Sequence, residues 1–264
     1  MPYRVDLHDP GDAAFDRLID LGALDIEYSQ DARIAALMPD SVSPEQITTA
    51  LGVDAIAVSP ATARDDGSVW VLNPRPLRVG HLRIAPADTM PEPGTLRLID
   101  AEPFGTGLHP TTALCLEALD EAVQLNRPDA VLDVGTGSGV LALGALTIGV
   151  PRALGIDIDD EALRVAAENA RINALDRRLE LRRGGPDTLS GTWPLVLANV
   201  LAAPLIEMAP ALVRLVGRQG QLVLSGVPSS AEHEVAQAFM RLGMRRLHVR
   251  SRGGWVVLVL QPSW

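Results

Sequence analysis

The 264-residue sequence predicts an α/β protein: a doubly wound, mostly parallel sheet with an antiparallel C-terminal hairpin, preceded by a small α+β domain. Three observations support this. Short apolar runs alternate with amphipathic helical stretches through the second half of the chain. One of those runs, Ala130–Val134, leads directly into a glycine-rich loop, Gly135–Gly139. Near the end, two strand-like runs flank Gly253-Gly254, which predicts the hairpin.

The central stretch is a βαβ unit. A strand at Ala130–Val134 is followed by the loop Gly-Thr-Gly-Ser-Gly, a helical run to Gly149 and a second strand ending at Asp157. In such a unit the loop backbone approaches a ligand closely and the helix N-terminus points at it. An acid at the end of the second strand accepts hydrogen bonds from a ribose. The unit therefore predicts an adenosine-bearing cofactor at the carboxyl edge of the sheet.

The loop also indicates which cofactor. A dinucleotide fingerprint needs a third small residue, and Val140 stands at that position. Asp133 lies two residues before the first glycine, where it would repel a pyrophosphate. It suits the cationic methionine end of S-adenosylmethionine. We therefore favour S-adenosyl-L-methionine over a nicotinamide cofactor. The structural alternative is a glycine turn that merely closes a βα unit.

The chain is expected to divide into three parts: a recognition domain at residues 1–60, an extended linker at 61–103 and the cofactor-binding domain at 104–264. Strands alternate with helices in the first part, which predicts a small α+β domain with the ferredoxin-like fold as one candidate. The expected helices are 13–21, 44–51, 113–123, 160–173, 201–216 and 229–242. The expected strands are 5–7, 23–28, 54–59, 69–72, 82–85, 96–99, 130–134, 152–157, 179–182, 194–199, 221–224, 244–250 and 255–261.

Two further stretches offer candidate site residues. In Phe104–Thr112, either threonine at the end can cap the helix that follows, and a capped helix start with no further role is the alternative. His109 precedes a proline and is as readily held for structure, so we assign it no catalysis. Asn199 ends a buried strand whose carboxyl end faces the cofactor crevice, where its amide offers an acceptor and donors. A turn-forming asparagine is the alternative there.

Composition narrows the class of protein. Apolar residues make up 47% of the chain, yet no run of about 18 of them appears, so we expect no membrane span. The polar start excludes a signal peptide. A single cysteine, Cys115, excludes an intramolecular disulfide and a cysteine-based zinc site, and we assign no metal ligands. These features predict a cytoplasmic protein. The net charge of −10 disfavours nucleic acid and suits a basic partner, such as a lysine-rich protein.

Four ordered motifs carry a resemblance to a known family. They are Phe104–Gly107 with His109–Thr112, then Asp133–Gly139, then Gly155–Asp159, then Ala198–Leu201, and the later Leu224–Val227 also fits. Together they resemble the methyltransferases that modify protein eleven of the large ribosomal subunit. The match covers roughly Arg97 to the C-terminus. Leu108 departs from the family, in which a polar residue is common at that place, and the N-terminal half shows little motif-level match.

The resemblance implies a Rossmann-like class I methyltransferase domain that uses S-adenosylmethionine to methylate lysine side chains and the N-terminal amine of a ribosomal protein. It implies a small N-terminal domain that grips the substrate protein. Asn199 is our candidate for orienting the attacking amine. The cofactor-binding residues that we carry over are Thr106, Thr112, Gly135, Gly137, Asp157 and Asn199. The rival interpretations are a methyltransferase for another protein or a small molecule, a binding protein without catalysis, and a nicotinamide oxidoreductase.

Overall fold

The computed structural model describes residues 2–8, 13–29, 33–53, 56–63, 70–71, 77–99, 110–252 and 254–264. The chain forms two compact units. The first comprises Met1–Pro74, Leu108–Pro110 and Arg252–Gly254, and the second comprises Arg75–Gly107, Thr111–Ser251 and Trp255–Trp264. The domain limits that we expect from the sequence stay a prediction.

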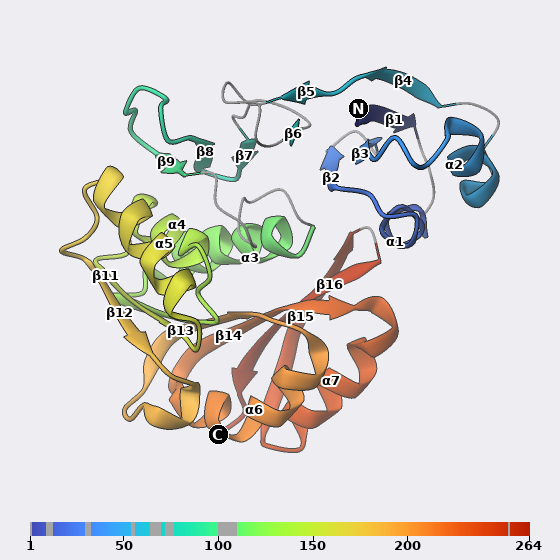
Figure 1. Ribbon diagram of the computed structural model, residues 1–264. Coiled ribbons are helices and arrows are strands. Elements are labelled where there is room, and N and C mark those ends of the chain that lie inside the picture. Colours follow the sequence, from blue (N-terminus) through green and yellow to red (C-terminus); the bar gives the residue numbers. More distant parts are fainter. Residues whose placement is uncertain are drawn as a thin grey trace. The chain divides into compact units, whose positions relative to one another are not determined.

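The first unit contains a four-stranded antiparallel sheet in the order β2-β3-β1-β4 (Figure 1). Its elements are β1 (Tyr3–His8), α1 (Ala14–Asp20), β2 (Asp25–Ser29), β3 (Arg33–Met38), α2 (Pro44–Leu51) and β4 (Ala57–Pro60), followed by a short pair, β5 (Thr62–Ala63) and β6 (Trp70–Val71). The βαββαβ order with this sheet order is the ferredoxin-like arrangement. The small N-terminal α+β domain expected from the sequence is therefore present.

Local chemistry explains where α2 begins and ends. The Ser43 hydroxyl accepts a hydrogen bond from the Gln46 amide (3.3 Å), and the Gln46 side chain accepts one from the Ser43 amide (2.7 Å), which completes a capping box. Gly52 closes the helix in the left-handed conformation, as expected from the sequence. Arg17 of α1 donates to the Ala50 carbonyl (3.0 Å), which satisfies a free acceptor at the helix end.

The strand β3 is absent from the sequence prediction. It contains Ala35 and Ala36, and alanine is a weak strand former. The strand nevertheless lies inside the sheet, paired with β1 on one side and β2 on the other. Both alanines are buried. Pairing on two sides and burial outweigh the unfavourable propensity.

The second unit is built on a seven-stranded sheet in the order β12-β11-β10-β13-β14-β16-β15. Five strands are mutually parallel, and β16 runs antiparallel to β14, so the predicted doubly wound, mostly parallel sheet is confirmed. The strands are β10 (Ala130–Val134), β11 (Arg152–Asp157), β12 (Leu179–Arg183), β13 (Trp193–Asn199), β14 (Val216–Pro228), β15 (Met244–Arg252) and β16 (Trp255–Pro262).

Helices cover both faces of this sheet (Figure 1). One face carries α3 (Pro110–Asn126), α4 (Val140–Thr147) and α5 (Asp160–Ile172), and the other carries α6 (Ala202–Leu215) and α7 (Glu232–Met240). A hydrophobic core lies on each face of the sheet, and successive strand residues point into opposite cores. Leu195 and Leu197 pack with α3 and α4, whereas Val196 and Ala198 pack with α6 and α7. Burial on both faces is why the strands are continuous apolar runs in the sequence.

A three-stranded sheet adds to the first helical layer. It consists of β7 (Leu77–Val79), β8 (Leu82–Pro86) and β9 (Thr95–Leu98), and its side chains are buried with those of α3 and α4. The turn between β7 and β8 is fastened to α3, because Asp120 accepts a hydrogen bond from the His81 amide (3.3 Å). A β-carbon at Gly80 would lie 2.2 Å from the Asp120 carboxylate, so this turn requires glycine.

Three predicted helix limits are wrong by three residues each: the start and the end of α3, and the start of α7 at Glu232. The helix α3 begins at Pro110, so Thr111 and Thr112 lie inside it, buried, and neither caps it. Proline fits the first helical position because no amide donor is needed there. The helix α6 matches its predicted limits to within one residue, and the chain continues from Leu215 directly into β14.

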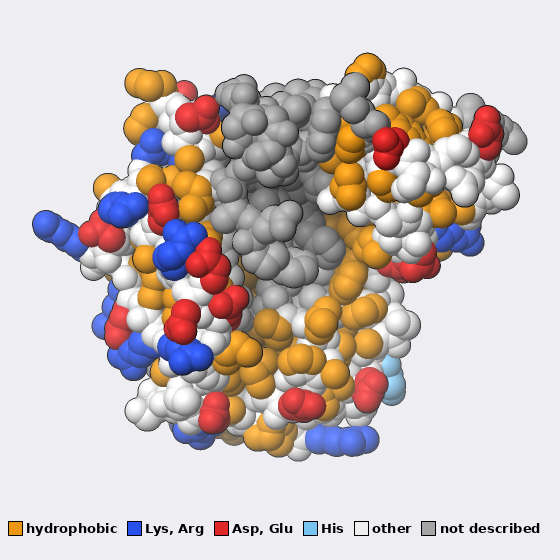
Figure 2. Space-filling view, in the orientation of Figure 1, with side chains coloured by type: hydrophobic (Ala, Val, Ile, Leu, Met, Phe, Trp, Pro, Cys, Tyr) orange, Lys and Arg blue, Asp and Glu red, His pale blue; other side chains and the backbone are white. Residues whose placement is uncertain are grey.

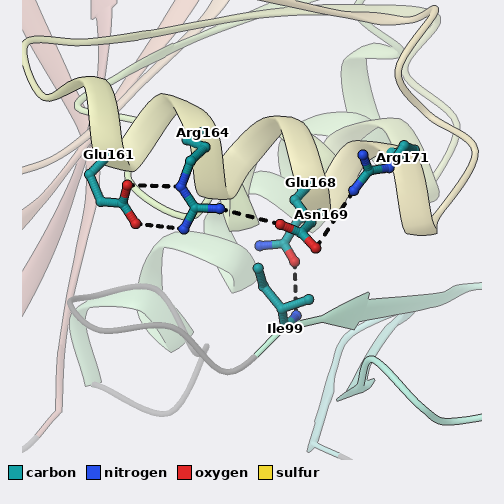
Figure 3. Close-up of polar contacts among 6 residues, drawn as sticks. All are labelled: Ile99, Glu161, Arg164, Glu168, Asn169 and Arg171. Atoms are coloured by element: carbon teal, nitrogen blue, oxygen red, sulfur yellow. Dashed lines mark hydrogen bonds and ion pairs between the residues drawn. The ribbon is translucent and has the colours of Figure 1, made fainter.

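The solvent face of α5 carries the charged residues expected there. Arg164 pairs with Glu161 (2.6 Å) and Glu168 (3.4 Å), and Arg171 pairs with Glu168 (3.6 Å) (Figure 3). Figure 2 shows acidic and basic side chains interspersed over this part of the second unit. Such exposed pairs each contribute about 0 to 1 kcal/mol. Within the described part of the chain, no helix has the length and apolar character needed to cross a membrane.

Candidate functional site

The glycine loop Gly135–Gly139 lies between β10 and α4. Its three glycines all have positive φ, a backbone conformation that side chains disfavour. The amides of Gly135 and Thr136 donate to the Ile156 carbonyl of β11 (2.9 and 3.0 Å), which fastens the loop to the neighbouring strand. The result is a fixed backbone that a ligand can approach closely, as the sequence predicts.

Asp157 is held against this loop. Its Oδ2 accepts a hydrogen bond from the Gly137 amide (2.9 Å), and its Oδ1 accepts one from the Asp159 amide (3.1 Å). The side chain is partly exposed at the end of β11. Each carboxylate oxygen has a second lone pair, so both can still accept from hydroxyl groups. Two of the predicted cofactor residues, Gly137 and Asp157, are therefore brought together.

Asp133 is buried beneath the same loop. Its Oδ2 accepts from the Thr136 hydroxyl (2.7 Å) and from the Ala142 amide (3.2 Å), so it fixes both the loop and the start of α4. Its Oδ1 is buried and accepts no hydrogen bond from the described residues. Burial raises the pKa of this carboxyl to about 6, the two hydrogen bonds oppose the rise, and the charge of Asp157 adds to it. Asp133 thus has a structural role in addition to the charge that the sequence indicates.

Asn199 and Thr112 meet at the carboxyl end of β13. The Asn199 side-chain amide donates to the Thr112 hydroxyl (3.3 Å), and no described residue donates to its Oδ1. Ser225 pairs with Asn199 on the adjacent strand β14, and its hydroxyl donates to the Thr111 carbonyl (2.9 Å). The ends of β13 and β14 therefore hold the first turn of α3.

Val200 packs against both Gly135 of the glycine loop and Gly226 of β14. A β-carbon at Gly135 would lie 2.6 Å from Val200 Cγ1. A β-carbon at Gly226, whose φ is +79°, would lie 2.3 Å from the Val200 carbonyl oxygen. Only glycine fits at either place. The residue that follows Asn199 is therefore packed between the glycine loop and the bend in β14, which brings Asn199 to the same sheet edge as the loop.

Sequence reasoning assigned no role to two buried polar residues of this region, Asn169 and Ser225, although Ser225 lies within the matched stretch Leu224–Val227. Asn169 contacts the glycine loop from α5, where its side-chain amide donates to the Ser138 carbonyl (2.9 Å). It lies among the buried residues Val165, Ala166 and Ala170 of that helix. An amide on the apolar side of an amphipathic helix is the signal that would have found it.

Thr106 and His109 lie outside the described residues, together with the rest of Phe104–His109. Thr106 therefore stays a prediction, and so do the individual binding and catalytic roles of Thr112, Gly135, Gly137, Asp157 and Asn199.

Known proteins resemble this chain along most of its length. The model of a family described as ribosomal protein L11 methyltransferase (PrmA) matches residues 19–263. The chain belongs to this family. Its members include the ribosomal protein L11 methyltransferase of Pelobacter propionicus, which is 38% identical over 214 residues, covering 78% of this chain and 69% of that protein. The one from Geobacter sulfurreducens is 44% identical over 190 residues, covering 70% of this chain and 62% of that protein.

A solved structure agrees. The crystal structure of ribosomal protein L11 methylase from Lactobacillus delbrueckii subsp. bulgaricus superimposes with a TM-score of 0.63 at 29% identity, covering 70% of this chain and 95% of that one. Family membership confirms the resemblance and the class I methyltransferase fold expected from the sequence. The chain is thus an enzyme of the methyltransferase class, whose members in general use S-adenosylmethionine.

Proposed function

We propose that this enzyme transfers methyl groups from S-adenosyl-L-methionine to amino groups of ribosomal protein L11, namely lysine side chains and the N-terminal amine. The relatives are named for that substrate. The observation that carries the proposal is the convergence of the glycine loop, Asp157 and Asn199 on one edge of the sheet. The alternative is a methyltransferase of the same fold that acts on another protein or a small molecule.

The residues present fit the methyl donor. The carboxylate of the donor's methionine part can approach the backbone of the glycine loop. Asp157 offers acceptors for the ribose hydroxyls of the donor. The negative charge of Asp133, buried beneath the loop, favours a cationic group over a pyrophosphate. Thr112 stands beside Asn199 at the same edge. When bound, S-adenosylmethionine would supply an electrophilic methyl group on a sulfonium, whose sulfur leaves as a neutral thioether and needs no acid catalysis.

Asn199 has the geometry of an orienting residue. Its side-chain nitrogen donates to the Thr112 hydroxyl, which restricts the rotamers of Asn199. Its Oδ1 can then accept a hydrogen bond from an attacking amine. A lysine amine, with a reference pKa of about 10.4, must first lose a proton. A dry site disfavours the ammonium form and lowers that pKa. The protein's contribution is then mainly alignment and desolvation.

The variant Asn199→Ala tests this role. Turnover at saturating methyl donor should fall about 100-fold, because the amine is no longer aligned. Binding of the product S-adenosylhomocysteine, measured by calorimetry, should change only a few-fold. Thr112→Val is the matched control, since it removes the hydroxyl that fixes Asn199 but leaves the acceptor in place, and it should lose less turnover. Undiminished turnover in Asn199→Ala would show that Asn199 does not orient the amine.

The substrate is tested separately. Purified enzyme, methyl donor and recombinant ribosomal protein L11 should give methylated L11 by intact-mass analysis. Labelling of other bands in a cell extract, with L11 unchanged, would favour the alternative substrate, and no labelled product at all would favour a binding protein. Calorimetric uptake of NADH without any of S-adenosylhomocysteine would indicate an oxidoreductase.

We also propose the cellular setting. The enzyme works in the cytoplasm, with the first unit as the substrate-recognition module. The net charge of −10 supports a basic protein partner over direct contact with nucleic acid.

A further inference from the structure

The buried side chain of Asn169 bridges two segments that are distant in the sequence. From α5, its Nδ2 donates to the Ser138 carbonyl of the glycine loop (2.9 Å). Its Oδ1 accepts from the Ile99 amide, directly after β9 (2.8 Å) (Figure 3). The side chain is 0% exposed, so both contacts are shielded from water. A shielded hydrogen bond to backbone is costly to break because the partner left behind has no water to replace it.

The contact with Ser138 bears on the loop that holds the methyl donor. Ser138 lies between Gly137, whose amide binds Asp157, and Gly139, whose amide donates to the Thr136 carbonyl (2.8 Å). The peptide joining Ser138 to Gly139 is planar, so an anchor on its carbonyl also fixes its amide. Packing adds to the anchor: a β-carbon at Gly139 would lie 3.1 Å from Ala166 Cβ of α5.

Asn173, the residue that caps the C-terminus of α5, makes a similar bridge to β9, and its Nδ2 also donates to the Asn169 carbonyl (2.7 Å). Its Nδ2 donates to the Arg97 carbonyl (2.6 Å), and its Oδ1 accepts from the Arg97 amide (2.9 Å). It has no contact with the glycine loop among the bonds that the structure describes. Asn173 is half-buried, whereas Asn169 is fully buried, and of the two only Asn169 contacts the glycine loop.

We propose that Asn169 is a positioning residue of the methyl-donor site, which holds the glycine loop in its binding conformation through the Ser138 carbonyl and couples that loop to the end of β9. The inference rests on the proposed function, because it takes the loop as the seat of the donor. Asn169 itself touches neither donor nor substrate; it acts through the loop backbone.

The variants Asn169→Asp and Asn173→Asp form a matched pair. Each keeps an acceptor for its backbone amide and replaces the amide donor with a carboxylate oxygen facing a carbonyl. Both should lower the thermal midpoint, but only Asn169→Asp should weaken S-adenosylhomocysteine binding, by about tenfold at pH 8. Relative to the wild type at the same pH, lowering the pH should restore that binding, because a protonated carboxyl donates to the Ser138 carbonyl as the amide does.

A measurement on the wild-type protein makes the test independent of how well the variants fold. Bound S-adenosylhomocysteine should slow hydrogen exchange at the Ile99 amide and leave exchange at the Arg97 amide little changed, because only Ile99 is linked to the loop through Asn169. Equal loss of binding in both variants, unchanged binding in Asn169→Asp, or unchanged exchange at Ile99 overturns the inference. Wild-type protein that takes up no S-adenosylhomocysteine overturns the proposed function instead, and the inference with it.

Discussion

Asp133 is expected to make the stability of the protein depend on pH. Burial raises the pKa of its carboxyl from 3.8 to about 6 in the folded protein, whereas the unfolded chain keeps the ordinary value. Between these two values the folded state binds the proton more tightly, so stability falls as the pH rises. Ionisation of buried Asp133 lowers the free energy of unfolding. This loss is absent below about pH 3.8 and complete above about pH 6. At 1.36 kcal/mol per pKa unit, that cost is about 3 kcal/mol.

The variant Asp133→Asn removes this cost while keeping an oxygen to accept from Thr136 and Ala142. From pH 4.5 to pH 8 the wild type should lose about 2 kcal/mol of unfolding free energy through Asp133, and the variant should not. Urea denaturation of both proteins at the two pH values measures the difference. A gap between variant and wild type that is the same at pH 4.5 and pH 8 would refute the reasoning.

The same carboxyl connects stability to cofactor binding. At pH 6 Asp133 is about half protonated, so uptake of a cationic methionine group should release about half a proton. Calorimetry with S-adenosylmethionine, in the absence of protein substrate and in two buffers of different ionisation enthalpy, detects that release. Asp133→Asn should bind more weakly and release none. Equal proton release from both proteins would assign the effect to another group.

Two further predictions concern backbone geometry and capping. Gly226→Ala should destabilise the protein by at least about 1 to 3 kcal/mol in urea denaturation, because its β-carbon would meet the Val200 carbonyl oxygen at 2.3 Å. Gly191→Ala, also at positive φ but in open space, should cost less, and equal losses would argue against the close contact. Ser43→Ala should cost about 1 kcal/mol through the lost cap of α2, with the exposed Ser41→Ala as a near-neutral control. A loss from Ser41→Ala as large as that from Ser43→Ala would contradict the role of the cap.

Most of the second unit was predictable because its strands are buried on both faces. Such strands are continuous apolar runs, and Ala130–Val134 and Arg152–Asp157 match the structure to the residue. Helix α2 was equally clear, since Pro44 and Gly52 mark its two ends. The strand β3 was not predicted because alanine has a low strand propensity. It is stabilised by pairing with a strand on each side, which the local sequence does not show. Long-range pairing is not encoded in local preference.

Some residues of the candidate site could likewise be predicted from the sequence, and others could not. The loop glycines and Asp157 belong to one contiguous motif, so spacing alone predicts that they meet. Ser225 and Asn169 make their decisive contacts with residues 114 and 70 positions away. Nothing local marks those partners, because they become neighbours only when the sheet and its helices assemble.

Val200 is closely packed on two sides: a β-carbon at Gly135 would lie 2.6 Å from its side chain, and one at Gly226 would lie 2.3 Å from its carbonyl oxygen. Under the proposed function, a substrate protein that displaced the turn after Asn199 would therefore also displace Gly135, at the start of the loop that we propose binds the methyl donor.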